Sequence, residues 1–307
     1  MEKKKIKFSS RKEFKFVTEI GRGSYGRVAL VIKRDSGRYY AAKFISRKVL
    51  RRKEIKKYVM NERNIMYSIR FTFTVYLEYF IQDSMNLYFI LPVALGGNLD
   101  SLIKNNGKLT ENSAKFYAAQ IVLALEYLHY MSIIYRDLKP GNILLDHFGF
   151  IKLTDFGFSK ILKVDRTYTM CGTAEYLAPE IILGHGYNLA ADWWSFGVVI
   201  YELCTGNTPF YARFKPQLFN RITTVDYYCP NYFTDSIQML LWNIFQLDIE
   251  RRFGTRIGHG VQDIKDHDWF SKIHWLLLAN RRIDPPYLPV VNLHISSQCP
   301  STSLSME

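Results

Sequence analysis

The sequence predicts an α+β protein with two lobes: a small β-rich N-terminal lobe with one main helix, and a larger, mainly helical C-terminal lobe. Three observations support this prediction. Strand-like segments dominate up to about residue 93, the glycine pair Gly96-Gly97 then interrupts the chain, and helical periodicity dominates from residue 179 to 275. A length of 307 residues with 48% hydrophobic content is enough for a substantial core.

Most of the predicted strands lie in the N-terminal part of the chain. Residues 14–20 (FKFVTEI) and 27–32 (RVALVI) flank a glycine-rich turn, and residues 37–46 (GRYYAAKFIS) alternate with the period of two that is typical of strands. This alternation places Ala41 and Lys43 on the same face of the third strand.

A helix and a last strand complete the predicted small lobe. Residues 46–69 are rich in lysine and arginine and compatible with a helix, whose apolar stripe includes Ile55, Val59 and Met66. Glu62 falls on the same stripe, so a carboxylate is predicted on the face that packs against the strands. The segment NLYFILPV then reads as a strand that leads into the glycine pair.

The clearest helix of the second lobe spans residues 111–130. Thr110 is a suitable N-cap, and apolar side chains recur along the segment at helical spacing. Short strands are predicted around Ile133, Ile143 and Ile151. The resulting division is a basic segment at 1–13, a first lobe at 14–93, a second lobe at 94–290, and a polar tail at 291–307 that we expect to be disordered.

Composition limits the classes of partner. The net charge of +13 is compatible with nucleic acid, an anionic membrane or a phosphorylated ligand. For the basic run RKVLRRKEIKK at 47–57 we favour a solvated helix face, so nucleic acid is not an expected partner. The four cysteines show no CxxC pair, which favours reduced thiols in the cytosol or nucleus. No signal peptide or membrane span is predicted.

A glycine-rich turn and a lysine could together hold phosphate groups. Residues 21–28 read GRGSYGRV, and glycines let backbone approach phosphate oxygens without a Cβ clash. Strands flank this turn on both sides, whereas a dinucleotide-binding loop would run into a helix. Lys43 lies on the next strand, and Glu62 on the following helix could pair with it and position its ammonium group.

The segment YRDLKPGN, residues 135–142, brings together an acid, two cations and an amide. Asp137 would orient a hydroxyl proton, and Lys139 would neutralise charge on a transferring phosphoryl group. Asn142 and Asp155, the latter in a DFG sequence, supply oxygens that suit Mg²⁺. Phosphoryl transfer depends mainly on positioning and charge stabilisation, so this set of residues favours that chemistry.

These motifs occur together, in order, as the signature set of protein kinases. The chain resembles the AGC group, and within it the catalytic subunits of cAMP-dependent protein kinase, over about residues 14–290. The stretches that carry the likeness are KFYAAQIVLALEYLH, IYRDLKP, TDFGFSK, EYLAPEIIL, DWWSFGVVIYE and RRFG. The resemblance implies a bilobal protein-kinase fold, ATP and Mg²⁺ as cofactors, and protein substrates with serine or threonine acceptors.

The resemblance also implies an ATP site. Adenine would lie between Val28, Ala41 and Leu144, with Leu91 as gatekeeper. A proline at position 92 keeps the carbonyl that the family uses there but has no N–H to donate. The implied ATP-binding residues are Ile20, Gly21, Arg22, Gly23, Ser24, Tyr25, Gly26, Arg27, Val28, Ala41, Lys43, Leu91, Pro92, Ala94, Asn98, Leu144 and Thr154.

Several further roles follow from the resemblance. Met66, Leu77, Tyr135 and Phe156 match the hydrophobic spine of active kinases. Thr169 matches the activation-loop phosphosite, so an upstream kinase is implied, and its phosphate would meet Arg136 and Lys160. Tyr58 stands where the family has a histidine that also reaches this phosphate. Glu180 could pair with Arg252, and Asp192 could hold the backbone of the catalytic loop.

The substrate-binding residues depart from the family. Lys139 with Thr173 resembles serine/threonine kinases, and Met170 with Leu177 would form an apolar pocket after the phosphoacceptor. Asn98 and Gly141 stand where close relatives carry glutamates that read substrate arginines, and of these acids only Glu202 is retained. We therefore expect a relaxed or shifted basic preference, and control by a regulatory subunit stays open.

The ends of the chain depart as well, since the family's N-terminal helix and the distal parts of its C-terminal tail have no match. This favours weaker ATP binding or lower stability than in full-length relatives. The alternative hypothesis is a pseudokinase or scaffold that keeps the fold and nucleotide binding. The presence of Lys43, Glu62, Asp137, Asn142 and Asp155 argues against this alternative.

Overall fold

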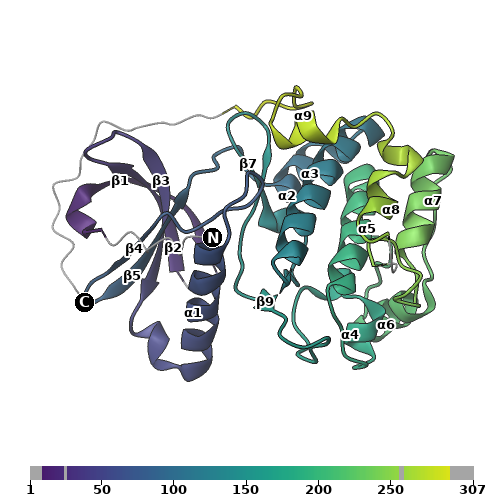
Figure 1. Ribbon diagram of the computed structural model, residues 1–307, viewed down its shortest axis with the longest axis horizontal. Coiled ribbons are helices and arrows are strands. Elements are labelled where there is room, and N and C mark those ends of the chain that lie inside the picture. The colour runs from purple at the N-terminus through teal and green to yellow at the C-terminus, as the bar shows by residue number, and fades with distance from the viewer. Residues whose placement is uncertain (1–8, 24–25, 256–258, 291–307) are drawn as a thin grey trace.

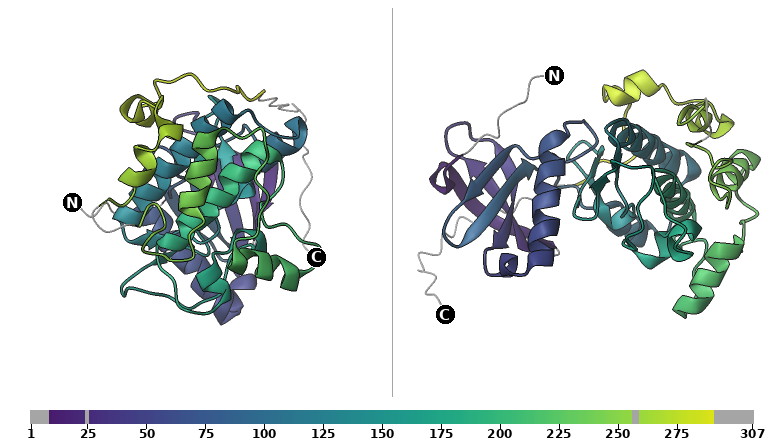
Figure 2. Two further views of the ribbon diagram at one scale, coloured as in Figure 1. Left: turned by 90° about the vertical axis from the view of Figure 1, so that its right-hand side faces the viewer. Right: turned by 60° about the horizontal axis from the view of Figure 1, so that its bottom comes forward.

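The structure, a computed structural model, describes residues 9–23, 26–255 and 259–290. Two lobes lie side by side (Figure 1). The right-hand view of Figure 2 shows the strands of the sheet gathered in one lobe and most helices in the other. This confirms the predicted α+β, bilobal architecture. The expected boundary at 93/94 lies between β5, which ends at Pro92, and α2, which begins at Leu99. The predicted segment 291–307 lies outside the described residues.

The small lobe is a five-stranded antiparallel sheet with helix α1 (Lys53–Ser68) on one face. The strand order is β1-β2-β3-β5-β4. The strands are β1 (Phe14–Gly23), β2 (Gly26–Lys33), β3 (Tyr39–Ser46), β4 (Tyr79–Gln82) and β5 (Asn86–Pro92). Ala41 and Ile45 of β3 are buried with Val59 and Met66 of α1, as the two predicted periodicities require.

The large lobe is mainly helical and is built around α3 and α5, which pack together. Its helices are α2 (Leu99–Asn106), α3 (Glu111–Tyr130), α4 (Pro179–Ile182), α5 (Ala190–Thr205), α6 (Lys215–Thr224), α7 (Asp235–Ile244), α8 (Gln262–Lys265) and α9 (Trp275–Ala279). Helix α3 has the predicted bounds because Thr110 Oγ1 accepts from Ser113 N at its start. No helix of the described ranges has the length and apolar character needed to cross a bilayer.

Two short two-stranded ladders in the large lobe flank the segments that contain the predicted catalytic residues. Strand β7 (Ile143–Leu145) pairs with β8 (Ile151–Leu153), and β6 (Ile133–Ile134) pairs with β9 (Lys160–Ile161). Short 3-10 turns complete the structure at Arg11–Glu13, Val49–Arg51, Pro140–Asn142, Ala174–Tyr176 and Asp268–Phe270. The YRDLKPGN segment lies between β6 and β7, so its ends are fixed by paired backbone on both sides.

Candidate active site between the lobes

A cavity of about 830 Å³ opens between the two lobes, within the usual size range of small-molecule sites. Walls come from β1, β2, β3 and β5 of the small lobe, and a floor comes from β7 of the large lobe. The predicted ATP-binding residues that line it are Ile20, Gly21, Arg22, Gly23, Val28, Ala41, Lys43, Leu91, Pro92, Ala94, Asn98, Leu144 and Thr154.

Two residues of the predicted ATP set lie elsewhere. Arg27 alternates onto the outer face of the sheet, where its guanidinium is 3.9 Å from Glu19. Gly26 does not line the cavity, because its backbone presses against β3. A Cβ at Gly26 would lie only 1.8 Å from the carbonyl oxygen of Phe44, so strand packing requires this glycine. Ser24 and Tyr25, also in the predicted set, are outside the described residues.

The glycine pair after β5 is fixed to the large lobe by hydrogen bonds. Gly96 N donates to Leu145 O, and Leu145 N donates to Gly97 O, both at 2.8 Å. A Cβ at Gly96 would lie 2.8 Å from the same Leu145 carbonyl, so the close approach needs glycine. This connection holds Leu144 beneath the cleft, directly across from the small lobe.

Lys43 and Glu62 form a buried ion pair, with Lys43 Nζ 2.6 Å from Glu62 Oε1. Strand β3 supplies the lysine and helix α1 supplies the glutamate, as the sequence predicted. Burial raises the pKa of Glu62, while the neighbouring Lys43 acts in the opposite direction. The pair therefore positions the lysine at the cleft and ties that position to the placement of α1.

Asp137 is held by three neighbours. Thr173 Oγ1 donates to Asp137 Oδ1 at 2.9 Å, and Asn142 Nδ2 donates to Asp137 Oδ2 at 2.7 Å. Lys139 Nζ lies 3.0 Å from Asp137 Oδ2 and donates to Thr173 Oγ1 at 2.7 Å. The carboxylate is thus fixed in one orientation, and Asn142 connects it to the cleft, which Asn142 also lines.

The backbone before Asp137 is held by a buried carboxylate. Asp192 accepts from the backbone N–H groups of Tyr135 and Arg136, each at 2.8 Å. His129 Nε2 lies 2.9 Å from the same carboxylate. Arg136 has a positive φ of 72°, which costs energy for a residue with a side chain, and these bonds hold it there. The sequence predicted Asp192 but missed His129, since a lone histidine at a helix end carries no specific signal.

The predicted spine residues are all buried. Tyr135 packs edge-on against Phe156, with ring centroids 5.4 Å apart, and Leu77 N donates to Met66 O at 2.9 Å. Phe156 belongs to the DFG sequence and Met66 to α1. All four belong to one buried apolar cluster that includes residues of both lobes.

Asn142 and Asp155 fit a magnesium ion that is also bound by nucleotide phosphates. Both line the cleft, and because Asn142 Nδ2 is used by Asp137, the amide oxygen is left for another partner. In the described part of the chain, no three acidic, histidine or cysteine side chains gather into a metal site. Mg²⁺ usually takes one or two protein oxygens together with phosphate oxygens, which matches this sparse set.

The activation segment is ordered by neutral partners. Arg136 donates to the carbonyl of Phe158 at 2.6 Å and to the Tyr187 hydroxyl at 3.1 Å. Lys160 Nζ donates to Thr167 Oγ1 at 2.9 Å. Thr169 is exposed, and its carbonyl accepts a hydrogen bond from the Tyr187 hydroxyl. The two cations predicted to meet a phosphate on Thr169 therefore have other partners around the unmodified threonine.

The substrate side of the site keeps one strongly perturbed acid. Glu202 Oε2 accepts from the Tyr176 hydroxyl at 2.6 Å. Burial, with the nearby charges of Asp100 and Glu175, raises the pKa of Glu202 to about 7. Leu177 is buried while Met170 is exposed, so only one of the two side chains predicted to form an apolar pocket is open to solvent. Sequence patterns gave no indication of Asp100.

Asn98 and Gly141, at which the resemblance led us to expect glutamates, have identifiable local settings. Asn98 Oδ1 accepts from Ser101 N at 2.8 Å and caps helix α2. Its amide is 3.5 Å from the Gly141 carbonyl. A Cβ at Gly141 would meet no atom within 4 Å, so packing does not require the glycine. Neither side chain supplies a carboxylate at these positions.

The ion pair predicted between α4 and the RRFG segment is present and fully buried. Arg252 binds Glu180 through two bonds of 2.8 and 2.9 Å, and also donates to the carbonyls of Ala190 and Gln246. This two-bond geometry is the strong form of an arginine–carboxylate pair. It ties the end of the activation segment to the body of the large lobe.

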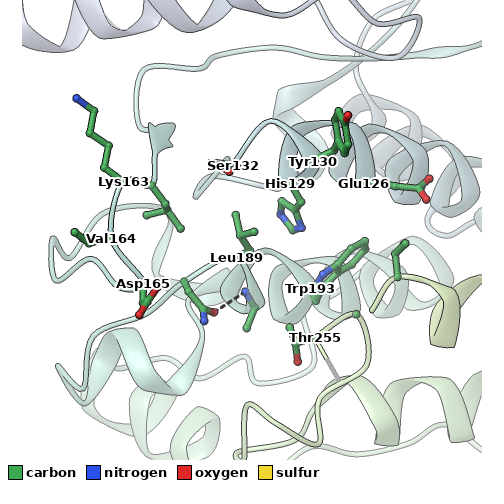
Figure 3. A pocket seen from close by; sticks show the side chains of 15 residues that line it. Glu126, His129, Tyr130, Ser132, Lys163, Val164, Asp165, Leu189, Trp193 and Thr255 are labelled. Carbon is green, nitrogen blue, oxygen red and sulfur yellow. Dashed lines mark hydrogen bonds between the residues drawn. The ribbon is translucent and has the colours of Figure 1, made fainter. Parts of the chain in front are cut away.

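A second cavity, of about 730 Å³, lies in the large lobe outside the cleft (Figure 3). His129 from the end of α3, Lys163 after β9 and Trp193 from α5 contribute to its lining. Because His129 also contacts Asp192, this cavity lies behind the catalytic loop.

Comparisons with known proteins agree with this geometry. Residues 14–270 match the family described as "Protein kinase domain". The chain is 43% identical over 276 residues to "cAMP-dependent protein kinase catalytic subunit 2" of Drosophila melanogaster, covering 89% of this chain and 77% of that protein. It is 40% identical over 279 residues to the "cAMP-dependent protein kinase catalytic subunit" of Schizosaccharomyces pombe, covering 91% and 54%.

A third relative is "cAMP-dependent protein kinase type 3" of Saccharomyces cerevisiae, 39% identical over 282 residues, with 92% of this chain and 70% of that protein covered. The chain thus spans between about half and about three quarters of the length of these relatives. Matching family, fold and catalytic motifs lead to one conclusion: the chain belongs to the protein kinase family, as a serine/threonine kinase of the AGC group.

Proposed function

We propose that this kinase transfers the γ-phosphate of ATP, bound with Mg²⁺ in the cleft between the lobes, to serine or threonine hydroxyls of protein substrates. The observation that carries the proposal is the hydrogen-bonded set around Asp137, which joins Lys139 and Thr173 to Asn142 at the cleft. Such a fixed arrangement suits phosphoryl transfer, which relies on positioning and on stabilising charge. The comparisons do not favour the pseudokinase alternative.

Each residue of the set has a distinct task. Lys43, held by Glu62, binds phosphate oxygens of the nucleotide. Asp137 orients the acceptor hydroxyl and takes its proton as the new phosphoester bond forms, while the bond from the γ-phosphorus to the β,γ-bridging oxygen breaks and ADP leaves. Lys139 lies beside Asp137 and stabilises negative charge on the phosphoryl group in transit. Asn142 and Asp155 would hold Mg²⁺, which supplies further charge neutralisation on the phosphates.

The proposed substrates have a relaxed or shifted requirement for arginine. Asn98 is used to cap α2 and Gly141 offers no carboxylate, so two of the acids that relatives use are absent. Glu202 remains and lies near Asp100 and Glu175. With Glu202 as the one retained acid, the site favours a single basic residue over an arginine pair, because a charge-assisted bond needs an acid at each cation.

Thr169 is the proposed site of activating phosphorylation by an upstream kinase. Its exposure makes the hydroxyl accessible, and Arg136 and Lys160 lie nearby as cations for the added charge. We place the protein in the cytosol or nucleus, since Cys171, Cys204 and Cys229 are free thiols, which suit a reducing compartment.

The test is transfer of ³²P from Mg-ATP to a degenerate serine/threonine peptide library, with the Asp155→Ala protein as the blank. We expect incorporation by the unmodified chain and none by the blank. The positional profile should show no strong dependence on an arginine pair. Absence of signal above the blank, even with Thr169 phosphorylated, would contradict the proposal and favour a scaffold.

A further inference from the structure

Helix α1 carries Glu62, so the position of α1 decides whether the Lys43–Glu62 pair can form. The helix covers the sheet on one side and contacts strand β9 of the large lobe on the other (Figure 1). Residues that fix α1 against the large lobe therefore influence the position of Lys43 without touching it.

One such contact is between aromatic rings. Tyr58 packs edge-on against Phe158, with centroids 6.1 Å apart and ring planes at 74°. Tyr58 lies four residues before Glu62 and so shares its face of the helix. Phe158 follows the DFG sequence directly. Within the described residues, no hydrogen bond of the Tyr58 hydroxyl is found, so the contact is made by the ring.

A second contact lies one residue before Glu62. Asn61 Nδ2 donates to the carbonyl of Ser159 at 2.7 Å. Ser159 is fully buried and its hydroxyl donates to Tyr135 O at 3.1 Å. The carbonyl of Phe158 accepts from Arg136 at 2.6 Å. The segment that α1 contacts is thus fixed from behind by the catalytic loop.

None of these contacts is made through Thr169. Arg136 and Lys160 are occupied by a carbonyl and two hydroxyl groups, and Tyr58 bears no charge with which to bind a phosphate. A loop phosphate would therefore have no charged partner at position 58 of α1.

We propose that Tyr58 is a positioning residue, which holds α1 in its active placement by packing on Phe158, independently of phosphorylation at Thr169. Phosphorylation would then order the substrate-binding part of the activation segment without moving α1. This inference rests on the proposed function, because it assigns Tyr58 a role in presenting Lys43 to ATP.

The experiment measures amide hydrogen exchange across Lys53–Ser68 and, separately, the KM for ATP and kcat. The proteins are the chain without substitutions, with and without a phosphate placed on Thr169 by an added upstream kinase, and the variants Thr169→Ala, Tyr58→Leu, Tyr58→Phe, Phe158→Leu and the double leucine variant. In Tyr58→Leu, exchange in α1 should rise about 2- to 13-fold, which corresponds to the ~0.5–1.5 kcal/mol typical of an aromatic pair. The KM for ATP should rise while the KM for peptide stays the same.

The controls separate the ring from other causes. Tyr58→Phe should match the unmodified chain, because the ring is kept. Thr169→Ala should leave exchange in α1 and the KM for ATP unchanged. Phe158→Leu should add nothing to Tyr58→Leu in the double variant, since either change removes the same contact. This cycle remains informative even if Tyr58→Leu lowers overall stability.

Three outcomes would overturn the inference. The first is hydrogen exchange in α1 of Tyr58→Leu equal to that of the chain without substitutions, and the second is a loss of α1 protection in Thr169→Ala as large as in Tyr58→Leu. The third is a fully additive effect of the two leucine changes on α1 exchange. Failure of the unmodified chain to transfer phosphate would instead contradict the proposed function. The exchange measurements would still test the ring contact in that case.

Discussion

The affinity of the kinase for a basic peptide should depend on pH through Glu202. Burial raises the pKa of this carboxyl to about 7, well above the 4.5 of an ordinary glutamate, and Asp100 and Glu175 add to the increase. Below pH 7 the folded protein therefore holds a neutral Glu202, which attracts a cation weakly. Above pH 7 the group is ionised and can form a charge-assisted bond with a substrate arginine or lysine.

The size of the effect follows from the titration. For a pKa near 7, roughly 10% of Glu202 is ionised at pH 6 and roughly 90% at pH 8. If the ionised form alone binds the basic residue, the KM of a basic peptide should fall about 10-fold between these pH values. A bound cation would itself favour ionisation, so the change should begin somewhat below pH 7.

The assay compares two peptides that differ in one residue, arginine or its neutral replacement, at each pH from 6 to 8. The ratio of their KM values cancels the effects of pH on catalysis and on the nucleotide, which act equally on both peptides. Glu202→Gln should abolish the slope of this ratio. A slope that persists in Glu202→Gln, or a flat ratio in the unmodified chain, would refute the reasoning.

Three further predictions concern individual residues. Replacing Arg252 by Met should lower the free energy of unfolding, measured in urea, by about 3–5 kcal/mol, because Glu180 is left buried and unpaired. As a control, Arg251→Met at the exposed neighbouring position should change it by less than about 0.5 kcal/mol. In the same assay, Gly26→Ala should lower the free energy of unfolding by roughly 1–3 kcal/mol, because the added Cβ would overlap a backbone oxygen. Gly21 has open space around it, so Gly21→Ala should cause no steric destabilisation. Equal destabilisation by the two changes would contradict this reasoning. A Cβ at Gly141 would meet no atom within 4 Å, so Gly141→Glu should be accommodated. It should raise the preference for arginine two residues before the phosphoacceptor roughly 10-fold on a peptide array, and an unchanged array would exclude this role.

Local patterns in the sequence determined the fold class and the chemical identity of the site. The helix at Glu111–Tyr130 was predictable to its ends because capping and apolar spacing act within a few residues. The alternation of side chains that turns Lys43 toward the cleft and the order of the kinase motifs were likewise predictable from the sequence. Each of these signals lies within one element or one loop.

Tertiary structure decided which distant residues meet. Asp192 and His129, 63 residues apart in sequence, converge on the catalytic loop, and Tyr58 reaches Phe158 from the other lobe. Arg27 turned out to face away from the nucleotide cleft, because the register of β2 alternates its side chains and gives Val28 to the cleft. Asn98 caps a helix, and Glu202 acquires its raised pKa only from the burial and charges that folding brings together. Such properties depend on contacts between segments far apart in the chain, which spacing within a single segment cannot specify.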